Sequence, residues 1–380
     1  MNPWGKNGIV TSSPTRAAFA PGETANDGEA VMIMQNPDVR ILSLIAFGLL
    51  AGWGGGCGSS APRADGSPGV DAGTSEDSMG VSGSAFMLLV TETPPGPYIA
   101  QNLWASVLAF TVAGNGAPLV PATGIDKSAL ADPACLAFRA ASSEVFVGNR
   151  HGVNAADGVP GSISRFIYDK AAGTLTANGT ITGNSLSAVD QIAFNPMTGE
   201  MFVADFNYPT SGPSISRFTF DAAGNAVANG TLGSGPTGGL AFAADGVRLY
   251  ATSGGQASSI IRQFDLSNGG APLVDVTIAD APRLFNMAVR NGVLYVAAVD
   301  VNKVYRLAIG ASDDLTLKDS VTADGALSVA FSPDGNEMFT AAHLTSEFID
   351  RFSYNAADDS WTSTTKLMTT SSLGGILVLP

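Results

Sequence analysis

The sequence predicts an all-β protein, a six-bladed β-propeller built from four-stranded antiparallel blades. Two observations lead to this fold class. An apolar triplet recurs along the chain, and its third members lie 56, 48, 47, 42 and 47 residues apart. A period of about 40–50 residues made of strand-like runs is typical of propeller blades. The last triplet also has no second strand after it, which indicates how the ring closes. The triplets are Leu136-Ala137-Phe138, Ile192-Ala193-Phe194, Leu240-Ala241-Phe242, Met287-Ala288-Val289, Val329-Ala330-Phe331 and Ile376-Leu377-Val378.

Each repeat contains four predicted strands. The triplet lies in the first strand, and a turn such as Ser332-Pro333-Asp334-Gly335-Asn336 leads into a second apolar run, because Pro and Gly supply the turn dihedrals. The third strand alternates with period two, as from Ser162 to Asp169. The fourth strand is more polar, as expected of an outer edge. Fourth strands are predicted at Leu175–Ile181, Val227–Leu232, Leu273–Ile278, Leu315–Val321 and Trp361–Leu367.

The two ends of the repeat region are predicted to share one blade. Strands at Phe86–Val90 and Ser106–Val112 match second and third strands but follow no triplet, whereas the last triplet is followed only by the end of the chain at Pro380. The C-terminal strand therefore supplies the inner strand of the N-terminal blade. Five complete units and this composite make six blades. The alternative of seven blades requires an extra blade in the 56-residue interval, which is too short for two.

The N-terminal region predicts export and lipidation. Residues 41–53 form an apolar run after Arg40 that is too short to span a bilayer, which takes about 20 residues, and that suits a signal peptide. Cys57 follows small residues, which resembles a bacterial lipoprotein signal, although Gly-Gly-Gly at 54–56 departs from its aliphatic position. We expect residues 1–31 to be an untranslated or disordered leader, 32–56 the signal peptide, 57–83 the lipidated cysteine with a flexible Gly/Ser tether, and 84–380 the propeller. The expected location is the bacterial cell envelope, with the outer membrane favoured because no Asp follows Cys57; secretion is the alternative.

Composition limits the partners. The 380 residues include 45 Gly and 21 Pro, only 14% are charged, and the net charge is −14. Such an acidic chain is not expected to bind nucleic acid, whose phosphates would repel it. With Cys57 acylated, only Cys135 remains, so no disulfide is expected. We expect a monomer that contacts the membrane through its lipid anchor alone.

Residues that recur in every blade are expected to be scaffold. Five arginines occupy equivalent third-strand positions, and we expect them to snorkel or to pair with carboxylates between blades rather than form an anion site. Asn178 and Asn229 begin two Asn-Gly-Thr sequences at equivalent positions and are expected to serve in turns rather than carry glycans. The arginines are Arg165, Arg217, Arg262, Arg306 and Arg351.

Polar residues confined to one blade are the candidates for a site. Three predicted loops between second and third strands are long, at 92–104, 149–161 and 205–213, and they lie on the face where propellers usually bind ligands. Asp190 and Asn286 precede inner strands and are expected to point toward the mouth of the central channel. The candidate ligand-binding face comprises Glu92, Asn149, Arg150, His151, Asp190, Asp205, Asn207 and Asn286.

The candidate residues leave three chemical interpretations open. Oxygens of Glu92, Asn149 and Asp205 suit one Ca²⁺ or another divalent ion. Alternatively, Glu92 with Arg150 and His151 suits catalysis, in which one group polarises an ester and another acts as the base. The third interpretation is that these are ordinary polar residues at strand ends, facing water. His151 and His343, the only two histidines, belong to blades that are not neighbours, which argues against a two-histidine metal site.

The repeat wording resembles the lactonase and YVTN-type propeller repeats. The resemblance is carried by IAFNPMTGEMFVAD at 192–205, SISRFTFDAAGNAVANGTL at 214–232 and SVAFSPDGNEMFTAA at 328–342, and it extends over residues 84–380. The sugar-lactonase group with this repeat style usually has seven blades, so the count of six departs from it. The six-bladed gluconolactonase group holds a divalent ion with Glu, Asn and Asp. Glu92, Asn149 and Asp205 have these identities, but they come from adjacent blades and their flanking motifs do not match, so the similarity is one of composition and the activity is not transferred.

Two functions follow as hypotheses. The first is an extracytoplasmic, lipid-anchored module that binds a protein, peptide or sugar through its loop-rich face, without chemistry. The alternative is a metal-dependent lactone or ester hydrolase of the lactonase-like type. Fold class alone does not choose between them.

Overall fold

The computed structural model describes residues 84–93, 106–125, 130, 132–150, 160–183, 186–206, 215–235, 237–253, 259–312, 314–343, 347–369 and 372–380, and structural statements below concern these residues. The predicted leader, signal peptide and tether, including Cys57, lie outside them. So do most of the three long loops. Within the described part of the chain, no helix combines the length and apolar character needed to cross a bilayer.

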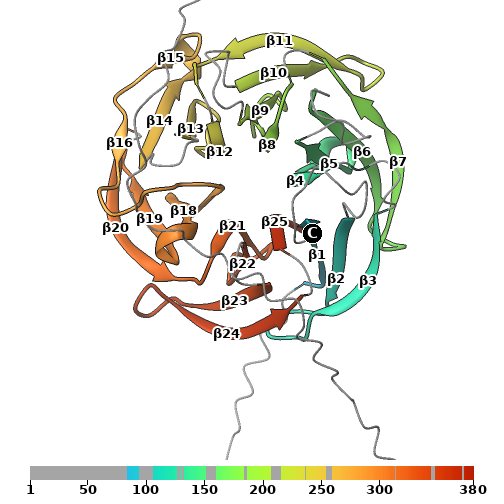
Figure 1. The fold of residues 1–380 in the computed structure, drawn as a ribbon, viewed down its shortest axis with the longest axis vertical. Helices are drawn as coiled ribbons and strands as arrows, with labels where there is room; N and C mark the ends of the chain where they lie inside the picture. The colour runs from blue at the N-terminus through green and yellow to red at the C-terminus, as the bar shows by residue number, and fades with distance from the viewer. Residues whose placement is uncertain are drawn as a thin grey trace, which may run out of the picture. The chain divides into compact units, whose positions relative to one another are not determined.

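Six antiparallel sheets surround one central axis, so the predicted six-bladed propeller is confirmed (Figure 1). The first three blades, from inner to outer strand, are as follows. Blade 1 consists of β25 (Ser372–Leu379), β1 (Phe86–Thr93), β2 (Ser106–Val112) and β3 (Val120–Ile125); blade 2 of β4 (Pro133–Arg139), β5 (Glu144–Asn149), β6 (Ser162–Asp169) and β7 (Thr174–Ile181); blade 3 of β8 (Val189–Phe194), β9 (Met201–Asp205), β10 (Ile215–Phe220) and β11 (Ala226–Leu232).

The other three blades complete the ring, and three short 3₁₀ turns, η2 (Ala140–Ser142), η3 (Leu266–Asn268) and η4 (Val299–Val301), lie between strands. Blade 4 consists of β12 (Thr237–Phe242), β13 (Arg248–Ser253), β14 (Ile260–Asp265), β15 (Ala271–Pro272) and β16 (Val276–Thr277); blade 5 of β17 (Met287–Arg290), β18 (Val293–Ala298), β19 (Lys303–Ile309) and β20 (Leu315–Thr322); blade 6 of β21 (Ala326–Phe331), β22 (Glu337–Ala342), β23 (Phe348–Asn355) and β24 (Ser360–Met368).

The ring closes through the C-terminal strand, as predicted. β25 pairs antiparallel with β1, with Leu88 opposite Val378 and Val90 opposite Ile376. The two ends of the propeller region therefore share one sheet, and Figure 1 shows β25 beside β1 near the axis. Opening the ring would remove an entire inner strand from blade 1.

Two outer strands differ from the sequence prediction. The fourth strand of blade 1, β3, was not predicted, because Pro121 and Gly124 weaken its strand pattern. The predicted strand Leu273–Ile278 is divided into β15 and β16, both paired with β14. Leu273 N still donates to Gln263 O at 2.9 Å, but Gln263 Nε2 donates to the carbonyl oxygen of Val274 at 2.7 Å, so the regular pairing is interrupted between Pro272 and Val276.

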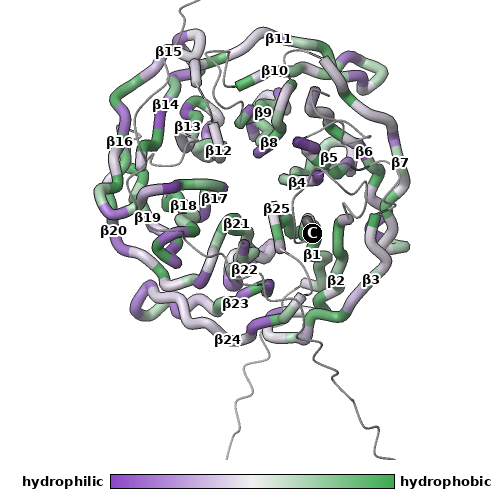
Figure 2. The backbone as a smooth tube through the Cα atoms, viewed as in Figure 1, coloured by the Kyte–Doolittle hydropathy of each residue, from purple (hydrophilic) through white to green (hydrophobic). Residues whose placement is uncertain are grey.

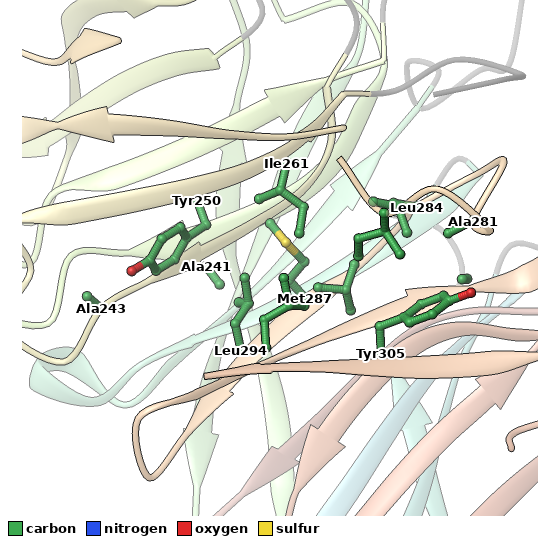
Figure 3. Packing of buried hydrophobic residues seen from close by; sticks show 13 residues of the cluster. Ala241, Ala243, Tyr250, Ile261, Ala281, Leu284, Met287, Leu294 and Tyr305 are labelled. Atoms are coloured by element: carbon green, nitrogen blue, oxygen red, sulfur yellow. The ribbon is translucent and has the colours of Figure 1, made fainter. Parts of the chain in front are cut away.

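The hydrophobic core is divided among the six blade interfaces. Each of six clusters joins side chains of two neighbouring blades. Figure 3 shows the interface of blades 4 and 5, where Tyr250 and Met287 are buried beside Leu294. In contrast, the outermost strand β24 is drawn mainly in pale colours in Figure 2, near the middle of the hydropathy scale. Successive side chains of a strand therefore point alternately toward the two neighbouring blades, because the surfaces between blades are the ones removed from water.

Three of the five repeated arginines, Arg165, Arg217 and Arg351, pair with a carboxylate of their own blade rather than between blades as predicted. Arg306 contacts Asp319 of its own blade and Asp359 of blade 6, and Arg262 donates to Ser234 O and Ser253 Oγ. Arg165 donates Nε at 3.1 Å to Glu144 Oε1, and Asn178 Nδ2 donates to the same oxygen at 2.7 Å. Arg217 and Asn229 repeat this arrangement around Glu200. Burial by itself would raise the pKa of Glu144, but hydrogen bonds from Ser142, Asn178 and Arg165 outweigh it and lower the pKa. These asparagines thus support a scaffold ion pair.

Candidate functional site

A recurrent β-bulge builds the mouth of the central channel. At the start of the inner strand the pairing register shifts, between Val189 and Gln191 in blade 3 and between Pro133 and Cys135 in blade 2, for example. The extra residue lies two positions before the apolar triplet and faces the axis, because a bulge redirects a side chain out of the ladder. We call the six residues at this position the throat ring; all of them line one cavity. They are Ala134, Asp190, Gly238, Phe285, Leu327 and Gly374.

Asp190 differs chemically from the other five members of the throat ring, which are small or apolar. It is 8% exposed. Arg150, the residue after β5, donates Nε at 3.0 Å and Nη2 at 2.6 Å to Asp190 Oδ1. Burial raises the pKa of Asp190, and the charge and hydrogen bonds of Arg150 oppose that rise. The ion pair therefore joins blades 2 and 3 across the edge of the cavity.

Asn286 and Ser328 follow the throat ring by one position and line the same cavity, whose volume is about 240 Å³ including its open mouth. Ser328 donates its hydroxyl to Gly374 O at 2.7 Å. The Oδ1 atom of Asn286 is covered and has no hydrogen-bond partner among the described residues. The throat thus presents one ion pair and one carboxamide on an otherwise apolar and glycine-rich ring.

Three residues predicted to share an ion are instead engaged within their own blades. Ser106 donates to Glu92 Oε2 at 2.5 Å, and the fully buried Asn149 donates Nδ2 to Ser162 and Ser164 at 3.2 and 3.1 Å. Both carboxylate oxygens of Asp205 accept from the loop before β8: Oδ1 from Ser187 Oγ at 2.6 Å and Ala188 N at 3.0 Å, and Oδ2 from Ser187 N at 2.8 Å.

These contacts do not fit a divalent ion held by Glu92, Asn149 and Asp205. The amide N–H of Asn149 faces two hydroxyls in the blade interior, and the lone pairs of Asp205 are occupied by N–H and O–H donors. In the described ranges, no group of three or more His, Cys, Asp or Glu side chains is arranged to hold a metal. His151 and Asn207, the other predicted face residues, lie outside the described residues.

His343 belongs to the same face and was not among the predicted site residues. It follows β22 as Arg150 follows β5, so the repeat position was the signal that identifies it. Its Nδ1 lies 3.1 Å from Leu373 O and 2.7 Å from Ser372 Oγ. The contact with the carbonyl oxygen is a hydrogen bond in the tautomer that carries its proton on Nδ1, and in that tautomer Nε2 is the basic nitrogen. Burial, then the charge of Arg150, lowers the pKa of His343, which favours the neutral ring.

Comparison with known proteins identifies the fold class. No protein-family model matches the sequence, and no curated protein sequence matches it. The periplasmic gluconolactonase PpgL of Pseudomonas aeruginosa superposes with a TM-score of 0.60 at 14% identity, covering 78% of this chain and 99% of that one. A candidate 6-phosphogluconolactonase of Bacteroides uniformis superposes with a TM-score of 0.55 at 18% identity, covering 76% and 84%.

A further similar structure comes from a binding complex. A chain in the crystal structure of the nidogen/laminin complex superposes with a TM-score of 0.55 at 12% identity, covering 77% of this chain and 98% of that one. At such identities the likeness establishes the fold alone. The fold shared with these proteins is the β-propeller.

Proposed function

We propose that this chain is a ligand-binding β-propeller that engages its ligand at the axial mouth of the loop-rich face. The observation that supports this most is the throat ring, in which Asp190 stands against five small or apolar residues. A buried charge is costly to retain in a scaffold position that glycine or alanine fills elsewhere in the ring. Asp190 and its partner Arg150 therefore depart from the repeat pattern, and this departure distinguishes them from scaffold residues.

The proposal extends to location and partners. The apolar run before Cys57 supports lipid anchoring in the bacterial cell envelope, with the outer membrane favoured. The partner is a protein, a peptide or a sugar that places one group in the throat, and the chain acts as a monomer. The cavity is small and open to solvent, which favours recognition of one protruding group over enclosure of a whole ligand.

A binding screen tests the proposed function. Purified protein is titrated with neutral oligosaccharides and with short envelope-type peptides while the backbone amide signals of throat residues are followed by NMR. We expect ligands that bind to shift the backbone amide signals of Gly238 and Gly374. Asp190→Asn should change the affinity of the protein for these ligands at least tenfold. Asp280→Asn is the matched control, because Asp280 is an exposed acid on the same face. Hits that bind both variants as they bind the original protein would contradict an axial site.

Lactone or ester hydrolysis is a second candidate, favoured by His343. A neutral imidazole whose Nδ1 is fixed by Leu373 O presents Nε2 as a general base. Nε2 would take a proton from water as the oxygen adds to the carbonyl carbon; cleavage of the ring C–O bond then releases the alkoxide, which takes the proton back. No step of this hydrolysis uses a metal ion. Five- and six-membered sugar lactones are the substrates to assay, and a rate equal to that of His343→Gln would remove this candidate.

A further inference from the structure

We propose that the throat receives the primary ammonium group of a lysine side chain. This inference rests on the proposed function, because it assigns the chemistry of the group that enters the axial mouth. Three features support it: a small gap among three oxygen atoms at Gly238, the lack of donors for these oxygens, and a surplus of negative charge around Asp190.

Three oxygen atoms converge at Gly238, where the absence of a side chain leaves a gap. A Cβ atom at this position would lie 3.2 Å from Thr252 Oγ1, 3.5 Å from Leu284 O and 3.7 Å from Asp190 Oδ2. These oxygens come from blade 4, from the segment that leads into blade 5 and from blade 3. The gap they bound at the edge of the cavity suits a group about as large as one water molecule.

Each of the three oxygens can accept a further hydrogen bond. Both hydrogen bonds from Arg150 use Asp190 Oδ1, and Oδ2 accepts none from the described residues. Leu284 O likewise accepts none within the described part of the chain. Thr252 Oγ1 accepts one backbone N–H at 2.6 Å and donates to one backbone carbonyl at 3.1 Å, so one of its two lone pairs remains. Because buried acceptors in proteins are almost always satisfied, this wall favours a group that donates several hydrogen bonds.

A fourth acceptor lies on the wall of the same cavity. Asn286 Oδ1 is covered and has no hydrogen-bond partner among the described residues. The throat therefore offers acceptors on more than one side, and its unmet need is for donors rather than for further oxygen atoms.

The charges around Asp190 are mainly negative. Asp132 and Asp205 raise the pKa of Asp190 through their charge, whereas Arg150 lowers it. The carboxylate of Asp205 accepts its hydrogen bonds from uncharged groups, so these bonds do not neutralise its charge. Three carboxylates therefore act together with one guanidinium, and this surplus attracts a cation and repels an anion.

Two further groups on this face do not reverse the surplus. Arg283 forms an ion pair with Asp300, so the two charges offset each other. Burial and the charges of Arg150 and Arg283 lower the pKa of His343, which favours its neutral ring, although Asp132 opposes this shift.

A primary ammonium fits these features better than other cations. It has three N–H donors for the three oxygens at Gly238 and is close to water in size. A guanidinium is planar and larger, and Ca²⁺ takes 6–8 oxygen ligands, more than this gap offers. The methylene stem of lysine is linear and apolar, which suits passage between Phe285 and Leu327 of the throat ring, whereas the amine of an amino sugar is attached to a polar ring.

Four probes separate these chemistries. Butylammonium copies the end of a lysine side chain, butanol has the same stem with a neutral head, butanoate has an anionic head, and tetramethylammonium has the positive charge without any N–H. Each is titrated into the purified protein at pH 7 in 0.15 M salt, and the backbone amide signals of Gly238 and Gly374 report binding. We expect butylammonium to bind in the millimolar range and at least tenfold more tightly than the other three probes.

Two variants assign the contacts. Asp190→Asn keeps the side-chain shape, removes the negative charge and should weaken butylammonium binding at least tenfold. Asp280→Asn, which removes an exposed charge on the same face, is the matched control and should leave the affinity unchanged. Gly238→Ala leaves every charge in place but puts a methyl group into the gap, so it should reduce butylammonium binding at least tenfold, with Gly374 as the reporter. An unchanged amide spectrum away from the throat verifies that this variant is folded.

The possible outcomes distinguish this inference from the proposed function. Equal affinity for butylammonium and tetramethylammonium, or a preference for butanol or butanoate, overturns the ammonium assignment and leaves an axial binding site. Unchanged butylammonium affinity in Asp190→Asn or in folded Gly238→Ala overturns it as well. If the four probes cause no shift at Gly238 and Gly374 but the peptides or oligosaccharides of the binding screen do, only the ammonium assignment fails; if no compound shifts these signals, the axial site itself fails. Glucosamine that binds as tightly as butylammonium would overturn lysine as the source of the ammonium.

Discussion

Arg150 donates two hydrogen bonds, from Nε and Nη2, to the single oxygen Oδ1 of Asp190. Arg150 leaves blade 2 at the end of β5, whereas Asp190 is the bulged residue at the start of β8 in blade 3. The contact therefore joins two blades at the channel mouth. The Arg150 side chain is 32% exposed and the Asp190 side chain only 4%, so the more exposed charge is oriented by a carboxylate from within the fold.

Asp190→Asn is expected to change the free energy of unfolding by no more than about 1 kcal/mol, because the Arg150 side chain that loses its partner is 32% exposed and is solvated by water. Burial raises the pKa of Asp190 in the folded protein. The stability this group contributes is therefore complete below its unfolded pKa, near pH 4, and is lost as pH rises through the folded pKa. Urea unfolding at several pH values should show that the free energy of unfolding of the variant rises relative to that of the original protein from pH 4 to 8. A loss above about 3 kcal/mol at pH 7 would mean that the pair is structural.

Arg351→Met should be far more destabilising than Arg217→Met, although the two arginines are repeat-equivalent. Arg351 and Glu337 have side chains only 4% and 3% exposed, whereas Arg217 and Glu200 are 23% and 12% exposed. Removing one partner of a buried pair leaves an uncompensated charge and costs about 3–5 kcal/mol. The more exposed pair should cost about 1 kcal/mol. Chemical denaturation measures both, and equal losses would contradict burial as the cause.

Gly375→Ala should weaken ring closure. A Cβ atom at Gly375 in β25 would lie 2.6 Å from Cys135 Cα and 2.9 Å from Ala134 O, both backbone atoms that cannot move aside independently. We expect a loss of about 1–3 kcal/mol from overpacking. Gly292→Ala is the control: it has φ +71 with nothing within 4 Å, so it carries only the conformational cost of about 1–2 kcal/mol. Hydrogen exchange should distinguish the two variants. The exchange rates of backbone amides in β25 and β1 should rise in Gly375→Ala and not in Gly292→Ala.

The imidazole of His343 should titrate below the ordinary histidine pKa of about 6.5. Burial disfavours its charged form, and Arg150 repels the added proton. Replacing His151 by Gln leaves one imidazole signal for an NMR titration. In that background Arg150→Gln should raise the pKa of His343, and Arg262→Gln, in the third strand of blade 4, should not. Because the folded pKa is lowered, stability from this group is lost as pH falls below about 6.5. A pKa at or above 6.5 would contradict the proposed neutral base.

Much of the fold was predictable because the repeat marks every inner strand. The triplets lie in β4, β8, β12, β17, β21 and β25, and the unmatched triplet at Ile376 predicted closure through β25. The exceptions are outer strands. β3 and the divided β15 and β16 depend on backbone pairing and on a hydrogen bond from Gln263, which composition does not encode.

The candidate site was predictable in part. Asp190 and Asn286 stand beside inner-strand triplets, and both line the throat as expected. Glu92, Asn149 and Asp205 share one repeat position, yet each side chain turns to a different partner inside its blade. Sequence spacing places a residue on a face, but the direction of its side chain depends on which neighbouring donor is within 3 Å.

The sequence by itself determined the number of blades, their order and the way the ring closes, because a hydrophobic period is a local property that repeats wherever a strand must be buried on both sides. The tertiary structure decided which polar residues meet. The pairing of Arg150 with Asp190 and the hydrogen-bond-free amide of Asn286 arise only when bulges from different blades converge on one axis. That convergence depends on how six sheets pack, which no single repeat contains.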